Sequence, residues 1–179
     1  MATQSTKPED AFYLAVGYRF SAKSLWQQIQ SIFGPANVDG LLAEHFPPTA
    51  LSALVLECLS IELYLKCLIQ VEQQLPTTPR GHGLIDLFKQ LSQEKQDRIK
   101  VLFDAKEPPS SDVALWEFDK VLTSLNDAFV SWRYAHEYGM KQTTFDTRLA
   151  ISIQEAALEQ MPAWQHLIQF RTISAISTQ

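Results

Sequence analysis

The spacing of apolar residues predicts helices along almost the whole chain. Apolar positions recur three and four residues apart over residues 9–33, 49–74, 84–104, 113–138 and 146–173. This spacing places side chains on one face of a helix. The sequence has no Asn-Gly or Asp-Gly turn and no long alternating run, which are the usual signs of β-hairpins. We therefore expect an all-α protein with four to five main helices.

Glycine, proline and small polar residues divide these segments. Gly34, followed by a proline, ends the first helix; Ser92 breaks the third helical region, and Gly139 ends the fourth helix. Pro162 should kink the last helix, because proline cannot donate the backbone hydrogen bond that a continuous helix needs. With loops between neighbouring helices, the pattern predicts an up-down bundle that forms a single domain over residues 1–179, with residues 1–9 disordered.

The apolar stripes identify the expected core. Residues 50–69 are apolar nearly all round the helix, as expected for a central buried element. The first and fourth helices have narrower stripes. They comprise Ala11, Ala15, Tyr18, Ala22, Leu25, Ile29 and Ile32, and Phe118, Leu122, Leu125, Phe129, Trp132 and His136.

Two charged pairs lie within these apolar segments. Glu62 and Lys66 are four residues apart in the most apolar helix, and Arg133 and Glu137 are four apart at the end of the fourth. Residues at this spacing share a helix face, and an isolated buried charge is very costly. In an up-down bundle the second and fourth helices run in the same direction, which matches opposite charges along both. We therefore predict one buried ionic cluster of these four residues.

Composition limits the classes of partner. The chain of 179 residues is 46% hydrophobic, with a formal net charge of -5, which argues against a broad basic surface for nucleic acid but not against a small basic pocket. Cys58 and Cys67 would be roughly 13 Å apart along one helix, too far for a disulfide. Free thiols and the absence of a signal-like N-terminus predict a cytoplasmic location. Charged residues within 50–69 argue against a membrane span.

Three residues are candidates for chemistry, each with an alternative structural role. His82 opens the third helix and either exchanges a proton or caps its own helix. Arg133 either holds an anionic group bidentately or pairs internally with Glu62. His136 lies on the apolar stripe and is either a core histidine or a site residue. The sequence contains no Glu-x-x-His, Cys-x-x-Cys or His-Glu-x-x-His motif and no phosphate-binding glycine loop, so we expect neither metal nor cofactor.

Together these residues resemble the HEPN superfamily, the higher eukaryote and prokaryote nucleotide-binding helical domains. The resemblance covers roughly residues 10–140. It rests on three motifs in order, Glu62-Leu63-Tyr64-Leu65-Lys66, Gly81-His82-Gly83-Leu84 and Trp132-Arg133-Tyr134-Ala135-His136-Glu137. It implies a bundle of four or five helices that forms a homodimer. It also implies a role in RNA processing, defence or toxin–antitoxin systems, with a nucleotidyltransferase or an antitoxin as a possible partner.

One departure from the family pattern bears on activity. Catalytic HEPN members carry Arg, four to six residues and then His, which form a metal-independent ribonuclease site, whereas only two residues separate Arg133 and His136. We therefore expect a HEPN-like module without its own ribonuclease activity, with His82, Lys66 and Arg133 as candidate ligand-binding residues. Two alternatives remain. One is an interaction or dimerisation bundle with no nucleotide ligand. The other is a ribonuclease in which His136 acts as general base and Arg133 holds the phosphate.

Overall fold

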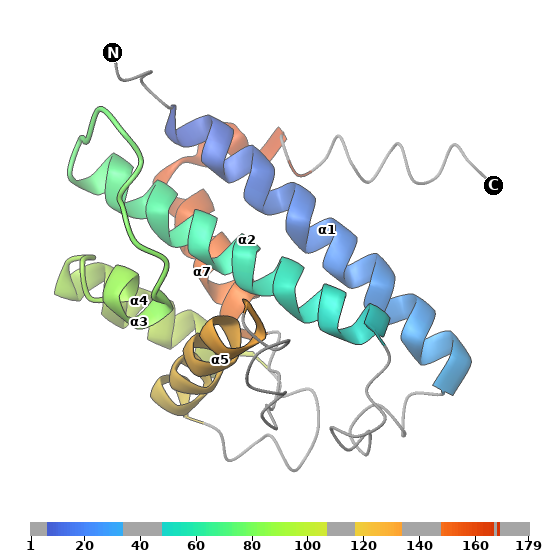
Figure 1. The fold of residues 1–179 in the computed structure, drawn as a ribbon. Helices are drawn as coiled ribbons and strands as arrows, with labels where there is room; N and C mark the ends of the chain where they lie inside the picture. Colours follow the sequence, from blue (N-terminus) through green and yellow to red (C-terminus); the bar gives the residue numbers. More distant parts are fainter. Residues whose placement is uncertain (1–6, 34–47, 107–116, 134–147, 167, 169–179) are drawn as a thin grey trace, which may run out of the picture.

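A computed structural model of the chain describes residues 7–33, 48–106, 117–133, 148–166 and 168. These residues form a bundle of helices without a strand among them (Figure 1), which confirms the all-α prediction. The elements are α1 (Pro8–Phe33), α2 (Pro48–Glu72), α3 (Leu84–Phe88), α4 (Gln93–Asp104), α5 (Phe118–Arg133), α7 (Arg148–Gln160) and the short 3-10 helix η3 (Pro162–Trp164).

The two longest helices, α1 and α2, pack side by side in opposite directions (Figure 1). The Phe12 ring lies 5.4 Å from the Tyr64 ring, and Arg19 lies beside Glu57 nearer the other end of the pair. Most of the predicted stripe on α1 is buried or half-buried, but Ile32 is 73% exposed. The buried face instead includes Phe12, which the predicted stripe missed. Because α1 begins at Pro8, residues 8 and 9 are helical rather than disordered.

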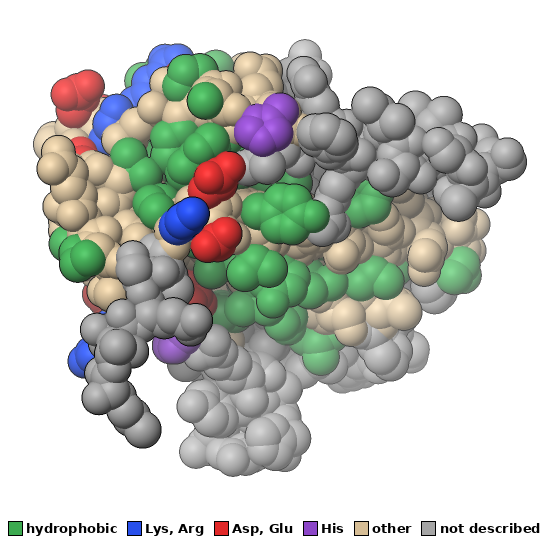
Figure 2. Space-filling view, turned by 90° about the horizontal axis from the view of Figure 1, so that it is seen from above, with side chains coloured by type: hydrophobic (Ala, Val, Ile, Leu, Met, Phe, Trp, Pro, Cys, Tyr) green, Lys and Arg blue, Asp and Glu red, His purple; other side chains and the backbone are tan. Residues whose placement is uncertain are grey.

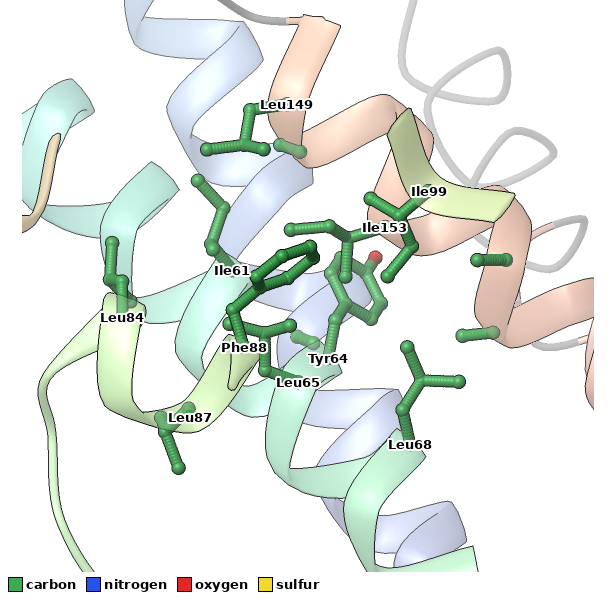
Figure 3. Packing of buried hydrophobic residues seen from close by; sticks show 14 of the residues in the cluster. Ile61, Tyr64, Leu65, Leu68, Leu84, Leu87, Phe88, Ile99, Leu149 and Ile153 are labelled. Carbon is green, nitrogen blue, oxygen red and sulfur yellow. The ribbon is translucent and has the colours of Figure 1, made fainter. Parts of the chain in front are cut away.

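Helix α2 lies at the centre of the core, as its apolar sequence predicts. Its side chains meet those of α3, α4 and α7 in one cluster (Figure 3). Residues that meet there include Ile61, Tyr64, Leu65 and Leu68 from α2, Leu84, Leu87 and Phe88 from α3, Ile99 from α4, and Leu149 and Ile153 from α7. Hydrophobic burial of this kind is the main favourable contribution to folding. It also means that a charge in the middle of α2 is removed from water.

The predicted break in the third helical region is present. The backbone N–H of Ser92 donates to Glu72 of α2 (3.1 Å), and the Ser92 hydroxyl accepts from the backbone N–H of Lys95 as the N-cap of α4. A serine at this position satisfies an N–H group that the helix itself leaves unpaired. Helices α3 and α4 are therefore separate elements joined at a residue that is anchored to the end of α2.

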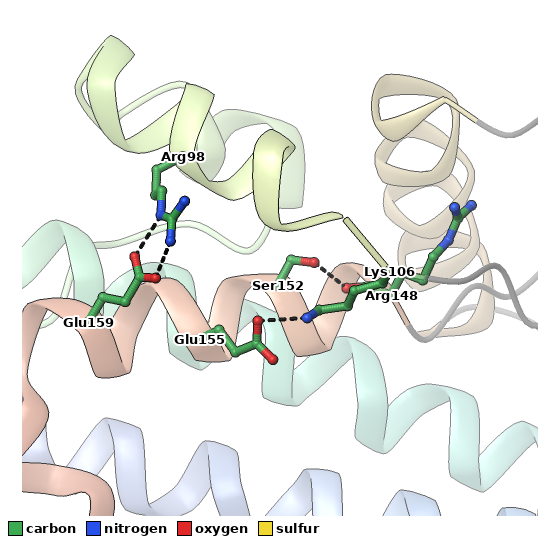
Figure 4. Close-up of polar contacts among 6 residues, drawn as sticks. All are labelled: Arg98, Lys106, Arg148, Ser152, Glu155 and Glu159. Carbon is green, nitrogen blue, oxygen red and sulfur yellow. Dashed lines mark hydrogen bonds and ion pairs between the residues drawn. The ribbon is translucent and has the colours of Figure 1, made fainter. Parts of the chain in front are cut away.

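Helices α4 and α7 are joined by salt bridges on their outer sides. Arg98 contacts both carboxylate oxygens of Glu159, and Lys106 Nζ lies 2.6 Å from Glu155 (Figure 4). Helix α7 then ends at Gln160, and Pro162 begins η3. The predicted interruption near Pro162 is therefore confirmed.

The predicted common direction of the second and fourth helices is wrong. After α2, residues 73–83 return along α2, so that α3 begins near Glu62. Helix α3 then runs in the same direction as α2 until Ser92 meets Glu72. Helix α5 runs opposite to α3, because Phe118 packs on Phe88 while Asn126 contacts the start of α3. In the prediction the third helix returned along α2. In the structure the loop over residues 73–83 returns instead, and α5 therefore runs opposite to α2.

Candidate functional site

A buried ion pair occupies the middle of α2. Lys66 Nζ donates to Glu62 Oε1 at 2.7 Å, across one turn of helix. Only 4% of Glu62 and 7% of Lys66 are exposed. The surrounding turns of the helix are apolar, so bulk water does not solvate either charge. The two charges therefore stabilise each other. This confirms that Glu62 and Lys66 are buried together.

His82 completes this site from the returning loop. Its Nδ1 lies 2.9 Å from the same Glu62 oxygen that accepts from Lys66. In contrast to the two α2 residues, its side chain is 59% exposed. We call Glu62, Lys66 and His82 the Glu62 cluster. The cluster joins a fixed, buried charge pair to an imidazole that solvent can reach.

The contact between His82 and Glu62 distinguishes between the two roles weighed for the histidine. The N-cap position of α3 is Gly83, which has no side-chain cap. Asn126 of α5 accepts from the backbone N–H of Ile85 instead, at 3.4 Å. The contact that orients His82 is therefore with α2, and the N-cap residue of α3 is Gly83 rather than the histidine.

Two glycines shape the backbone around His82. Gly81 has φ +95°, a conformation that residues with a Cβ rarely adopt. A Cβ on Gly83 would lie 3.0 Å from Asp86 Oδ2 and 3.6 Å from Asn126 Oδ1, so the small residue allows α3 and α5 to approach. The sequence Gly-His-Gly thus lets the chain turn from the loop into α3 with the histidine facing Glu62.

The hydrogen bond to Glu62 determines the chemistry available to the imidazole. When a carboxylate accepts from Nδ1–H, the neutral ring has its acceptor at Nε2, and the ring is held in one orientation. The other oxygen, Glu62 Oε2, is buried and has no hydrogen-bond partner among the described residues. The cluster thus combines an imidazole in a fixed orientation with a carboxylate that has a hydrogen-bond partner among the described residues on only one of its two oxygens. This arrangement suits binding of a polar group or exchange of a proton at the protein surface.

Arg80 adds a cation to the same loop. It lies two residues before His82, is exposed, and makes no ion pair with any described residue. Sequence reasoning missed it because a single arginine in a loop has no distinguishing pattern. Its proximity in the chain to an oriented histidine is the signal that would have identified it.

The remaining predicted site residues are not brought to this cluster by anything described. Arg133 is the last described residue of α5, and its side chain, His136 and Glu137 lie outside the described residues. Because α5 runs opposite to α2, matching of opposite charges no longer supports a four-residue ionic cluster.

The described residues also bear on the expected absence of a metal and of a membrane span. No group of three or more His, Cys, Asp or Glu side chains within the described ranges has a geometry suited to a metal ion. Among the helices of those ranges, none combines the length and apolar character needed to cross a bilayer.

A second buried carboxylate lies nearer the start of α2. Glu57 is 4% exposed, and its Oε1 lies 3.9 Å from Arg19 Nε of α1. Burial raises the pKa of Glu57 from 4.5 to about 7, and the positive charge of Arg19 opposes part of this increase. The sequence analysis recognised Glu57 only as a charge unsuited to a membrane. Its burial depends on α1, whose packing face was incompletely predicted.

Comparison with known proteins adds no assignment: no protein-family model, curated protein or solved structure matches the chain.

Proposed function

We propose that this protein is a HEPN-like module that binds an anionic group of a nucleotide or RNA beside the Glu62 cluster, without cleaving RNA itself. The observation that carries the proposal is the exposed His82 imidazole, held in place by the buried Glu62–Lys66 pair. By resemblance, the biological setting would be RNA- or nucleotide-linked stress, defence or a toxin–antitoxin system.

The charges around the loop support an anionic ligand. Glu62 and Lys66 neutralise one another, so the cation of the loop beside this site is Arg80, with the exposed carboxylate of Asp86 on the other side of Gly83. Arginine binds phosphate through several N–H donors, and an imidazole adds a further donor or acceptor. A small basic loop on a chain of net charge -5 suits a single phosphate group better than a long nucleic-acid track.

Of the three residues of the Glu62 cluster, His82 alone is an accessible proton-transfer group. Attack by a ribose 2′-hydroxyl usually requires a base, an acid for the leaving oxygen and a cation for the phosphate. His82 supplies only one of the two proton-transfer groups, because Lys66 is buried and bound to Glu62. Binding without cleavage is therefore the favoured function of the cluster.

The test compares binding and cleavage in matched variants. Purified protein is incubated with labelled nucleotides and with total RNA, without added metal. Arg80→Gln/His82→Gln should weaken binding at least tenfold, whereas His166→Gln, which changes an exposed histidine in the last described segment, should not. Equal binding by all three proteins would contradict the proposed site.

The same experiment evaluates the ribonuclease alternative. RNA cleavage that is lost in a folded Arg133→Ala/His136→Ala variant would establish a metal-independent ribonuclease. It would also show that the shortened spacing between those residues still permits catalysis.

An interaction module is the second candidate, favoured by the outer face of α1. Tyr13, Leu14 and Phe20 are exposed there, and Figure 2 shows hydrophobic side chains across the face that is uppermost in Figure 1. Exposed apolar side chains that gather on one face are a feature of protein-binding surfaces. If neither nucleotide nor RNA binds, and the protein elutes as a dimer at micromolar concentration, this function is preferred.

A further inference from the structure

Glu57 lies at the contact between α1 and α2, and no described residue donates a hydrogen bond to its carboxylate. Its separation from Arg19, 3.9 Å, is within ion-pair range but longer than a hydrogen bond. The hydroxyl of Ser60 donates to the Glu57 backbone carbonyl, not to its side chain. An ionised Glu57 is therefore removed from water with only one loosely placed counter-charge.

Within the described ranges, no cation other than Arg19 of α1 acts on Glu57. On α2 itself, burial raises the pKa of both the Cys58 thiol and the Tyr64 hydroxyl, so both remain neutral. Glu62, five residues further along, is already paired with Lys66. The Tyr64 hydroxyl is also buried, without a hydrogen-bond partner in the described part of the chain.

We propose that the protonation state of Glu57 sets how tightly α1 packs on α2, so that α1 loosens from the bundle as the pH rises from the acidic range towards neutrality. Neutral Glu57 is compatible with the buried contact, since Arg19 is a quarter exposed and retains water. Ionised Glu57 favours an arrangement in which α1 moves away and water reaches the carboxylate. This pH-dependent packing of α1 does not depend on ligand binding at the Glu62 cluster.

The sign and size of the effect follow from the pKa of Glu57. It is raised by burial from 4.5 to about 7, so the packed state holds a proton that the open state releases. Stabilisation is complete below pH 4.5 and is lost as the pH rises towards 7. With these two values, the equilibrium constant for opening of α1 increases about tenfold between pH 6 and pH 8.

Amide hydrogen exchange of the full chain at pH 6 and pH 8 measures this opening directly. After correction for intrinsic exchange, amides of α1 should open about tenfold more at pH 8, while those of α4 provide an internal reference. Glu57→Gln, which has the same shape and no charge, should retain the pH 6 protection at pH 8. Glu9→Gln, a change of an exposed carboxylate on α1, should respond as the wild type does.

Arg19→Gln provides an independent check. Removing the cation raises the pKa of Glu57 further, so the loss of α1 protection should continue to higher pH, and opening between pH 6 and pH 8 should increase by more than in the wild type. Three results would overturn the proposal. They are a wild-type response in Glu57→Gln, an equal loss of protection in α1 and α4, and an unshifted transition in Arg19→Gln. The last of these decides the matter even if Glu57→Gln does not fold.

Discussion

Replacement of Lys66 by methionine is the most direct test of the buried charges. Methionine retains much of the apolar stem of lysine and removes the ammonium group, leaving Glu62 with His82 alone. The substitution therefore separates the contribution of the charge from that of packing. It also addresses the inference on which the candidate site depends, that Glu62 and Lys66 form a unit inside the protein.

The structure sets the expected loss. Breaking a buried ion pair by removing one partner costs about 3–5 kcal/mol, since the other charge stays buried without compensation. His82 still contacts the same Glu62 oxygen and is 59% exposed. This contact and the nearby water therefore stabilise one side of the Glu62 carboxylate. We expect Lys66→Met to lower the free energy of unfolding by about 3 kcal/mol at pH 8, the lower end of that range.

A double-mutant cycle gives this value a specific cause. Glu62→Gln combined with Lys66→Met should cost less than the sum of the single changes, because no uncompensated charge remains. Urea unfolding followed by circular dichroism measures the two single variants and the double variant at pH 8.

An exposed pair supplies the control. Lys120 lies 3.7 Å from Glu117, and their side chains are 66% and 76% exposed. Lys120→Met should therefore change the free energy of unfolding by no more than about 0.5 kcal/mol. If Lys66→Met costs as little as this control, the pair is not buried as described and the reasoning fails.

Four further substitutions test the fold around the site, each by urea unfolding. Phe12→Ala should lower the free energy of unfolding by about 4 kcal/mol because the ring is fully buried. Tyr13→Ala, at an exposed neighbouring residue, should lower it by less than about 1 kcal/mol. Equal losses would show that α1 packs on a different face. Gly81→Ala should cost about 1 kcal/mol or more at φ +95°, and a neutral result would exclude that backbone conformation. Ser92→Ala should cost about 1 kcal/mol through loss of the α4 cap; no change would mean that the cap is unimportant.

Helix positions and breaks were predictable because their causes are local. The spacing of apolar residues placed α2 within two residues at each end, and Ser92 and Pro162 interrupt the chain as expected. Capping and the missing N–H of proline act within a few residues. Positions along one helix therefore follow from the residues of that helix.

Relations between helices were less predictable because they depend on connections. The loop over residues 73–83 has the composition of an ordinary connection, yet it returns along α2 and reverses the expected direction of α5. The face of α1 was also incompletely predicted, since two overlapping stripes contain apolar residues and only packing against Tyr64 selects the one with Phe12.

The site was predictable to the extent that charge within an apolar helix is unusual. That rule identified Glu62 and Lys66, and the motif around His82 identified the histidine. It did not identify the burial of Glu57, because a single carboxylate near the start of a helix is more often exposed. Nor did it identify Asn126, whose contact with α3 depends on the direction of α5.

The two sides of the Glu62 cluster differ in stiffness. Glu62 and Lys66 lie at least six residues from the end of a 25-residue helix, beyond the reach of fraying at its ends. His82 belongs to a loop, and its exposed ring contacts Glu62 Oε1 through Nδ1. A ligand can therefore displace the imidazole without disturbing the charge pair. The change that accommodates the ligand is confined to the loop. Helix α2 keeps its position, so the imidazole can contact Glu62 again when the ligand leaves.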